Sequence, residues 1–412
     1  MLFYLYFISA FCYFVAAKNE DYKGYKVYNI ELRNQNQQEL ISELKDNLID
    51  FWTRPSFQYD VIGKAMVPPI LFDWFEKKLE EFGINKDVYI EDVYEFLTKE
   101  ESRTKSSEGI PESGFNITRY HTYDEILTYL RTLQTKYPNA KVELVEYGVT
   151  ELNRPIVYLR ITSNTNTAVE KPIVVIESGI IPRDWITVPA ALNIVEQVLS
   201  EQRFLNGLEW IVVPVLNPDG YEYTWTNLRL WVKSRSTSSH LGAICPGVNL
   251  NRNLDMDWLR FDSSSSPCST LYGGVEPFSE TETQMIRHIL EKNGSKVKLY
   301  LSLQNRGGYI SYPWNYENAA SGMLIQHHLL GLRMVNSMSE AYNLNLGSVI
   351  FDRASGTSSD YARAKGVLYT YNIDVVQRDT GVLIPEEDVS GIVDDVWKAV
   401  VVAADEMIRL YK

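Results

Sequence analysis

Metal ligation and carboxylate binding are the two kinds of chemistry that the side chains of this sequence could support. The candidates for metal ligation include its five histidines, His121, His240, His288, His327 and His328. His327 and His328 are neighbours within a predicted helix, so their rings point in different directions and cannot hold one ion. The candidates for carboxylate binding are arginines, because a guanidinium group forms two parallel hydrogen bonds with a carboxylate.

The composition excludes several classes of function. The chain has 412 residues, of which 45% are hydrophobic and 23% charged, and this length suits a modest domain followed by a large one. A formal net charge of −13 argues against nucleic acid or an anionic membrane as a partner, since both attract clustered Lys and Arg. We expect a monomer.

The N-terminus has the pattern of a secretory leader. Residues 1–17 form a short apolar run that ends in Val15-Ala16-Ala17, and small residues at such an end are typical of a cleavage site. The alternative is a membrane anchor, but the run is shorter than the ~20 residues that a spanning helix needs. We therefore expect a secreted, extracellular protein without a membrane partner after cleavage.

Once Cys12 has left with the leader, Cys245 and Cys268 predict one disulfide, with two free thiols as the alternative.

Two sequons for N-glycosylation gain meaning from this expectation. Asn116-Ile117-Thr118 and Asn293-Gly294-Ser295 both fit the pattern Asn-x-Ser/Thr, which matters only in an exported chain. The sequence leaves open whether either asparagine carries a glycan.

Hydrophobic periodicity divides the remaining chain into two globular parts. In the first part, strands are predicted at residues 25–32, 49–52, 59–62 and 88–93, and helices at 37–48 and 69–82. The order β-α-β-β-α-β is that of a ferredoxin-like sandwich. The charged segment 98–109 then lacks apolar periodicity and predicts a solvated helix end or linker, or else a site of proteolytic processing at Arg103 or Lys105.

From Phe115 onward the pattern is that of an α/β domain. Strands are predicted at residues 141–147, 156–161, 173–176, 210–215, 297–303 and 367–373, and helices at 123–137, 189–200, 280–292, 326–342 and 389–410. This alternation predicts a mostly parallel or mixed sheet that is covered by helices on both faces. Because ligands of such sheets bind at the carboxyl ends of the strands, the residues that follow the strands are the candidates for chemistry.

Eight motifs follow one another in this second part. They are Tyr120-His-Thr-Tyr-Asp-Glu-Ile126, Asn217-Pro-Asp-Gly-Tyr-Glu-Tyr-Thr224, Arg229-Leu-Trp231, Asn249-Leu-Asn-Arg-Asn253, Pro277-Phe-Ser-Glu280, Tyr312-Pro313, Ala354-Ser-Gly356 and Arg378-Asp-Thr-Gly381. In this order they resemble the pancreatic-type zinc metallocarboxypeptidases of the M14 family, and Cys245 and Cys268 sit where the family's disulfide falls. The first part looks like the family's activation segment. After the leader expected at 1–17, the resemblance implies an activation-segment domain at 18–108 and a carboxypeptidase-like domain at 109–412.

The resemblance implies a zinc site whose ligands this chain has replaced. The family removes the C-terminal residue of peptides with a zinc ion that is held by a His-x-x-Glu pair and a distant His. These positions fall on Ile181, Asp184 and Gln304. Ile181 has no lone pair, and an amide oxygen such as that of Gln304 is a poor zinc ligand that suits harder ions. We therefore predict that this chain binds no zinc and no other cofactor.

The other catalytic positions implied by the resemblance have changed as well. Asn249 stands where an Asp would orient the first His, and such a partner is typically worth ~10–100-fold in metal affinity or activity. Val232 stands where the family has the Arg that stabilises the oxyanion, a donor worth ~2.7–4 kcal/mol in the transition state. The general base falls on Asp374 or on Val376, depending on the direction of counting, and neither is Glu.

Part of the substrate-binding machinery is kept. Asn251 and Arg252 match the pair that holds the terminal carboxylate of the substrate, and Arg183 matches a further arginine of the cleft. The alternative is that Arg252 makes only internal ion pairs. Ser359 matches the floor of the specificity pocket, and Arg306, where the family often has Tyr, would add positive charge and bulk to the cleft.

Three hypotheses follow. The chain is an inactive, secreted homologue that binds peptide or protein C-termini, an active zinc carboxypeptidase with an unusual site, or a structural or storage protein with a plugged cleft. The site residues favour the first, because function depends on the site and not on the fold. Without catalysis, removal of the first domain has no obvious purpose, so we expect this domain to stay in place as a permanent lid.

Overall fold

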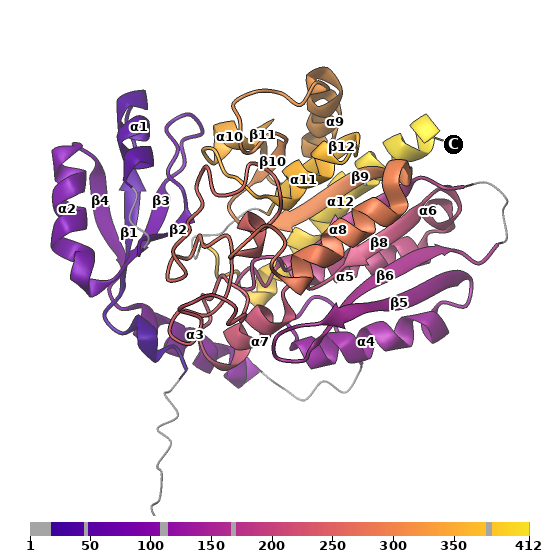
Figure 1. The fold of residues 1–412 in the computed structure, drawn as a ribbon, viewed down its shortest axis with the longest axis horizontal. Helices are drawn as coiled ribbons and strands as arrows, with labels where there is room; N and C mark the ends of the chain where they lie inside the picture. Colours follow the sequence, from indigo (N-terminus) through magenta and orange to yellow (C-terminus); the bar gives the residue numbers. More distant parts are fainter. Residues whose placement is uncertain (1–17, 45–47, 108–113, 166–169, 376–380, 412) are drawn as a thin grey trace, which may run out of the picture.

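The computed structural model of the chain describes residues 18–44, 48–107, 114–165, 170–375 and 381–411. The predicted leader at 1–17 and the alternative base position Val376 lie outside this part. A small N-terminal domain packs beside a large domain that holds the rest of the chain (Figure 1). In the described part, no helix is both long enough and apolar enough to span a bilayer.

The small domain is the ferredoxin-like sandwich that the sequence predicts. Its elements are η1 (Glu20–Tyr22), β1 (Lys26–Glu31), α1 (Gln35–Glu43), β2 (Asp50–Thr53), β3 (Gly63–Val67), η2 (Pro69–Leu71), α2 (Phe72–Glu81), β4 (Asn85–Ile90) and α3 (Val93–Ser107). The strands form an antiparallel sheet in the order β2-β3-β1-β4. Side chains alternate across β1, so that Tyr28 and Ile30 pack against α1 and α2, whereas Val27 packs toward α3 and the large domain.

The third strand of this sheet lies later than predicted. The sequence predicts a strand at residues 59–62, but β3 begins at Gly63 and the preceding residues form a turn. Tyr59 and Val61 pack against Tyr309 of the large domain. Their apolar character therefore reflects the contact between the domains and not a place in the sheet.

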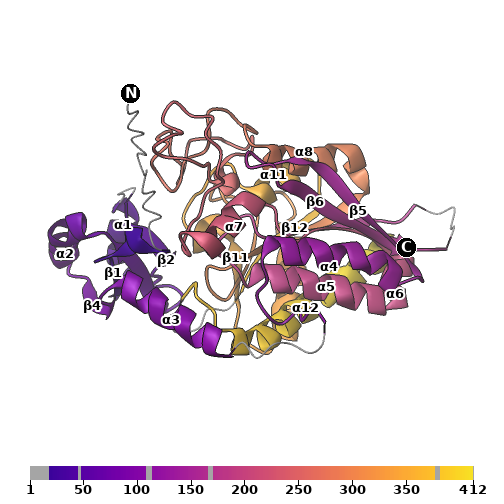
Figure 2. The ribbon, with the colours of Figure 1, turned by 90° about the horizontal axis from the view of Figure 1, so that it is seen from below.

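Helix α3 leads from the small domain toward the large one (Figure 2). It continues through most of the charged segment 98–109 and ends at Ser107, which agrees with the helix-end interpretation of this segment. Processing at Arg103 or Lys105 stays a prediction.

The large domain is built on one mixed sheet of eight strands. Its elements are α4 (Tyr123–Lys136), β5 (Ala140–Val149), β6 (Pro155–Ser163), β7 (Ile173–Glu177), α5 (Thr187–Ser200), α6 (Gln202–Gly207), β8 (Glu209–Val213), α7 (Pro218–Thr226), η3 (Leu250–Arg252), α8 (Thr281–Asn293), η4 (Gly294–Lys296), β9 (Val297–Gln304), β10 (Tyr309–Tyr312), α9 (Leu324–Ser337), β11 (Asn343–Leu346), α10 (Gly347–Ile350), α11 (Ser358–Ala364), β12 (Tyr369–Asp374) and α12 (Glu386–Tyr411). The strand order is β11-β10-β12-β9-β7-β8-β6-β5, with a parallel centre from β12 to β8.

All six strands predicted for this domain are present, and two more were missed. β10 and β11 have four residues each, which is too short for a period to show in the sequence. Helix α7 was missed as well, because Pro218 and Gly220 oppose a helix on propensity alone. Pro218 in fact stands at the first helical position, and Asn217 caps the helix by accepting a hydrogen bond from Gly220 N–H.

Helices cover both faces of the sheet, as predicted. Val174 and Ile176 of β7 pack into a core that includes α4, α5, α9 and α12. Val175, on the opposite face, packs into a second core that includes α8 and α11. The disulfide between Cys245 and Cys268 is also present.

The two domains share an apolar cluster, which should make them unfold together. Trp52 is 1% exposed and belongs to a cluster that also contains Leu97 of α3 and Leu230 and Val382 of the large domain. We expect one unfolding transition in urea, and a loss of ~3–5 kcal/mol in the free energy of unfolding for Trp52→Ala, because a large cavity is created. We also expect this variant to unfold in two steps, as monitored by circular dichroism.

Leu133→Ala, in the core of the large domain, is the matched control, with a comparable loss of ~2–5 kcal/mol and still one transition. Two transitions in the unaltered protein would contradict the coupling.

Candidate functional site

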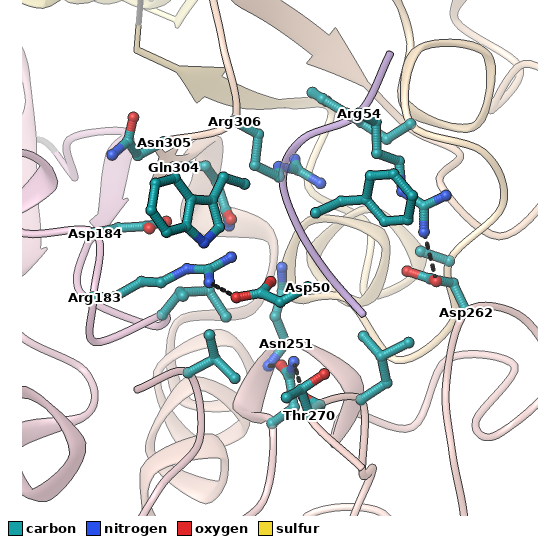
Figure 3. Close-up of a pocket in the computed structure, with 18 of the residues that line it drawn as sticks. Asp50, Arg54, Arg183, Asp184, Asn251, Asp262, Thr270, Gln304, Asn305 and Arg306 are labelled. Atoms are coloured by element: carbon teal, nitrogen blue, oxygen red, sulfur yellow. Dashed lines mark hydrogen bonds and ion pairs between the residues drawn. The ribbon is translucent and has the colours of Figure 1, made fainter. Parts of the chain in front are cut away.

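A cavity of about 160 Å³ lies between the small domain and the carboxyl ends of β7 and β9 (Figure 3). Residues 49–52 and Arg54 line it from the small domain. It brings together nine of the side chains that the sequence singled out: Ile181, Arg183, Asp184, Val232, Asn249, Asn251, Arg252, Gln304 and Arg306. The site predicted from widely separated motifs is thus one place in the structure, and the small domain covers it.

Ile181 and Asp184 are positioned by a tight turn after β7. Gly179 opens the turn with a φ of 65°, and a Cβ at this residue would lie 3.0 Å from the Cα of Val215. The position therefore needs glycine, which adopts this conformation without strain. The N–H of Asp184 donates to the carbonyl oxygen of Ile181 at 3.1 Å. Two of the three positions that correspond to family metal ligands consequently share one turn.

The third of these positions, Gln304, ends β9 and is 2% exposed. Its Nε2 donates to Oγ of Ser302 at 2.8 Å. With Ile181 and Asp184, the three positions offer one amide, one carboxylate and one aliphatic side chain, a donor set that does not fit zinc. Within the described part of the chain, no group of three or more His, Cys, Asp or Glu side chains is arranged to hold a metal ion.

Arg183 forms a buried ion pair with Asp50 of β2 and so connects the two domains (Figure 3). Burial disfavours the charge of Arg183, which is 8% exposed, but the attraction of Asp50 outweighs this effect and raises its pKa. Its carbonyl oxygen accepts a hydrogen bond from Nη1 of Arg229 at 2.8 Å. Its Nε is buried and has no acceptor among the described residues.

Arg252 makes internal contacts. Its Nη2 donates to Oδ2 of Asp262 at 2.7 Å, and its Nε donates to the carbonyl oxygen of the same residue at 2.6 Å. Arg54 of the small domain pairs with Asp262 at 3.0 Å and with Asp352 at 3.1 Å. These contacts favour the alternative in which Arg252 serves the fold.

Arg306 forms an ion pair with Asp374, the candidate base at the end of β12. Its Nε and Nη2 donate to the two carboxylate oxygens at 2.7 and 3.1 Å. The guanidinium group also lies 3.8 Å from the centre of the Phe351 ring. Asp374 is fully buried; burial raises its pKa and Arg306 opposes this shift, with burial the larger effect. The sequence marked both residues as changed but gave no sign that they pair.

Ser359 requires a correction, because it does not belong to the lining of the cavity. It is 1% exposed, and its Oγ accepts a hydrogen bond from Nδ2 of Asn315 at 3.0 Å. Asn315 also donates its N–H and its Nδ2 to the buried carboxylate of Asp360. Asn315 is itself 4% exposed, and a Cβ at Gly347 would lie 2.0 Å from its Oδ1, so this side chain is closely packed. The predicted pocket floor is a closed polar cluster.

Sequence reasoning missed the contribution of the small domain to the site. Asp50 belongs to the strand predicted at 49–52, and Arg54 follows it. The only signal is a pair of charged residues at the end of an otherwise apolar stretch. Their partners Arg183 and Asp262 could not be assigned before the docking of the two domains was known.

The fold and the cavity define a class of protein in which a ferredoxin-like domain covers the carboxyl edge of a mixed eight-stranded sheet. The family pattern described as zinc carboxypeptidase matches residues 126–399, and the pattern described as carboxypeptidase activation peptide matches residues 28–100. The chain belongs to the zinc carboxypeptidase family.

Individual relatives support this assignment. The chain is 30% identical to carboxypeptidase B of Helicoverpa zea, over 96% of this chain and 97% of the relative, and 30% identical to carboxypeptidase A1 of Sus scrofa, over 92% and 93%. The crystal structure of carboxypeptidase A from Helicoverpa armigera is similar with a TM-score of 0.88 and 29% identity, over 95% of this chain and 99% of that one. The thrombin-activatable fibrinolysis inhibitor is similar with a TM-score of 0.79 and 25% identity, over 93% and 99%.

The environment of Asp184 predicts a dependence of stability on pH. Burial raises the pKa of this carboxyl from 3.8 to about 7, and the nearby Arg183 and Arg306 only partly oppose the shift. Between these two pKa values the native chain holds a proton that the unfolded chain has lost, so the free energy of unfolding should fall as the pH rises from 4 to 7. The fall is at most about 4 kcal/mol, at ~1.4 kcal/mol per pKa unit.

Asp184→Asn should remove the contribution of Asp184 from the slope in urea titrations between pH 4 and 8, whereas the contributions of Glu282 and Asp360, whose pKa values burial also raises, should stay. Asp73→Asn, which changes an exposed carboxylate, should keep the whole slope. A slope that is the same in Asp184→Asn and in the unaltered protein would show that Asp184 is ionised throughout.

Proposed function

We propose that this protein is an exported member of the zinc carboxypeptidase family that does not cleave peptides and keeps its small domain as a lid over the cleft. The observation that carries the proposal is the donor set of Ile181, Asp184 and Gln304 at one end of the cavity. A zinc peptidase needs three protein ligands and an activated water. One carboxylate and one amide do not supply them.

None of the five histidines could take the place of the missing zinc ligands. All five belong to the described part of the chain, and none of them lines the cavity. His327 is fully buried in α9, and burial lowers its pKa to about 4. His121 stacks on Phe115 and His288 packs near Tyr147, both outside the cleft.

Two further features argue against hydrolysis. Val232 lines the cavity with an aliphatic side chain, which cannot donate a hydrogen bond to an oxyanion. Asp374 is held by both donors of Arg306, so that accepting a proton from water would require it to give up this ion pair.

The contacts between the domains support a permanent lid. The Arg183–Asp50 pair is buried, Arg54 reaches two aspartates of the large domain, and Trp52 packs in the shared apolar cluster. Removing one member of a buried ion pair typically costs ~3–5 kcal/mol. Release of the small domain would separate all of these groups at once.

Export is supported by two independent features. Residues 1–17 have the pattern of a cleaved leader, and the pair Cys245–Cys268 forms a disulfide, which persists in oxidising compartments.

Binding of peptide or protein C-termini is a second function that one observation favours. Nε of Arg183 is a buried donor without an acceptor in the described part of the chain, although Nη1 of the same group is taken by Asp50. A terminal carboxylate could use this donor if Asp50 moved away, and Asn251 lines the same cavity.

The first prediction from this proposal concerns zinc and activity. The purified protein should hold no stoichiometric zinc after dialysis, by mass-spectrometric metal analysis, and should release no C-terminal residues from peptides before or after limited trypsin treatment. The reason is the missing ligands at positions 181 and 304. One tightly held zinc ion per chain together with such release would establish the alternative, an active carboxypeptidase.

A variant that restores the ligands sharpens this test. Ile181→His, Asp184→Glu and Gln304→His together should bind about one zinc ion yet leave peptide release undetectable, because Arg306 still holds Asp374. The single variant Gln304→His is the control and should stay free of zinc.

The second prediction concerns peptide ends. Asp50→Asn should free Arg183 and raise the affinity for a peptide with a free terminal carboxylate at least about tenfold, or ~1.4 kcal/mol, in isothermal titration calorimetry. The same peptide with an amidated end should not bind.

Arg183→Met in the Asp50→Asn background should abolish the gain. If Asp50→Asn folds and still binds neither peptide, the cleft is plugged and the structural or storage role gains support.

A further inference from the structure

The first sequon lies on a turn that is anchored from both sides. The ring of Phe115 stacks on His121 and on Tyr129, with centroid distances of 4.0 and 4.1 Å. Ile117 packs against the main core of the large domain. Asn116, between these two inward-facing residues, is exposed.

The side chain of Asn116 is held in place by its oxygen alone. Its Oδ1 accepts hydrogen bonds from N–H of Thr118 at 3.0 Å and from Oγ1 of the same residue at 2.9 Å, which forms an Asx turn. Its carbonyl oxygen accepts a hydrogen bond from Nε2 of His121 at 2.7 Å, which fixes the backbone of the turn. Nδ2, the atom that glycosylation modifies, makes no hydrogen bond within the described part of the chain. This atom is therefore presented to solvent.

The second sequon has the opposite environment. Asn293 is the last residue of α8 and is 8% exposed. Its Nδ2 donates to the carbonyl oxygen of Ile289 at 2.7 Å in the helix interior. A sugar on this atom would replace one of its two hydrogens and would have to occupy space that the protein fills, since Asn293 is buried.

We propose that the exported chain carries an N-linked glycan on Asn116 and none on Asn293, an inference that rests on the proposed export. In this reaction Nδ2 of Asn116 bonds to C1 of the first sugar and loses a proton, while the bond from C1 to the pyrophosphate of a lipid-linked oligosaccharide breaks and the pyrophosphate leaves with the lipid. A chain modified at Asn293 before folding could not bury this side chain as the structure does. The folded product is therefore free of a glycan there.

The test is expression of the full chain in a secretory eukaryotic cell, once with residues 1–17 and once with an established secretory leader in their place. Enzymatic deglycosylation converts a modified Asn to Asp, which peptide mass spectrometry locates. We expect Asp at position 116 and Asn at position 293, and a loss of one glycan's mass in the unaltered protein and in Ser295→Ala. Thr118→Ala and Asn116→Gln should show no change of mass, and Thr118→Ser, which keeps a hydroxyl, should restore it.

The two leaders separate the failure of export from the failure of this proposal. Modification of Asn116 behind the established leader supports the site even if residues 1–17 do not direct export. An unmodified Asn116 in folded protein secreted behind that leader, or a glycan on Asn293, overturns it.

Discussion

Compensation of buried positive charge is the constraint on which the cleft of this protein depends. Two arginines of the cavity, Arg183 and Arg252, are 8% exposed, and Arg306 is partly buried. Each has an aspartate as its partner: Arg183 with Asp50, Arg252 with Asp262 and Arg306 with Asp374. Moving an ion out of water costs several kcal/mol even after relaxation, and an opposite charge in good geometry is what offsets it. The positions of the three aspartates therefore decide what the arginines can still bind. Two of the aspartates belong to the large domain, and the third comes from the lid.

The pairing of arginines with aspartates also explains why the carboxyl groups of Asp374 and Asp184 have different surroundings. Asp374 has a bidentate partner, whereas no hydrogen bond or ion pair within the described residues reaches the carboxyl of Asp184 closely enough to offset its burial, and its pKa rises to about 7. Asp184 lies beside Ile181 and Gln304 in the lining of the cavity, and neither of these two side chains carries charge. The charges of the cleft are thus balanced among its own side chains, which supports the proposal that it functions without zinc.

The sequence predicted the fold well and the site in part, and the difference has a physical reason. Periodicity located the order of elements in the small domain and six of the eight strands of the large one, since each of these buries one face over several residues. It failed at residues 59–62, where apolar side chains serve the contact between domains, and at the short strands β10 and β11. The motifs singled out nine side chains that the structure brings together in the lining of one cavity. Motif spacing could not reveal that Arg306 holds Asp374 or that Asn315 donates a hydrogen bond to Ser359, because such pairings depend on side-chain directions across separate elements.

The lid follows from the same charge balance. If the connection between the domains were cut, the small domain would still hold Arg183 through Asp50 and would still bury Trp52 against the large domain. Dissociation would break the Arg183–Asp50 ion pair and expose the apolar cluster to water, and the exposure of apolar surface opposes it. A peptide end that entered the cleft would have to replace Asp50 on Arg183 while the remaining contacts of the lid kept β2 nearby. Peptide binding and lid closure therefore compete for one guanidinium group, and the lid has the advantage of being covalently attached at high effective concentration.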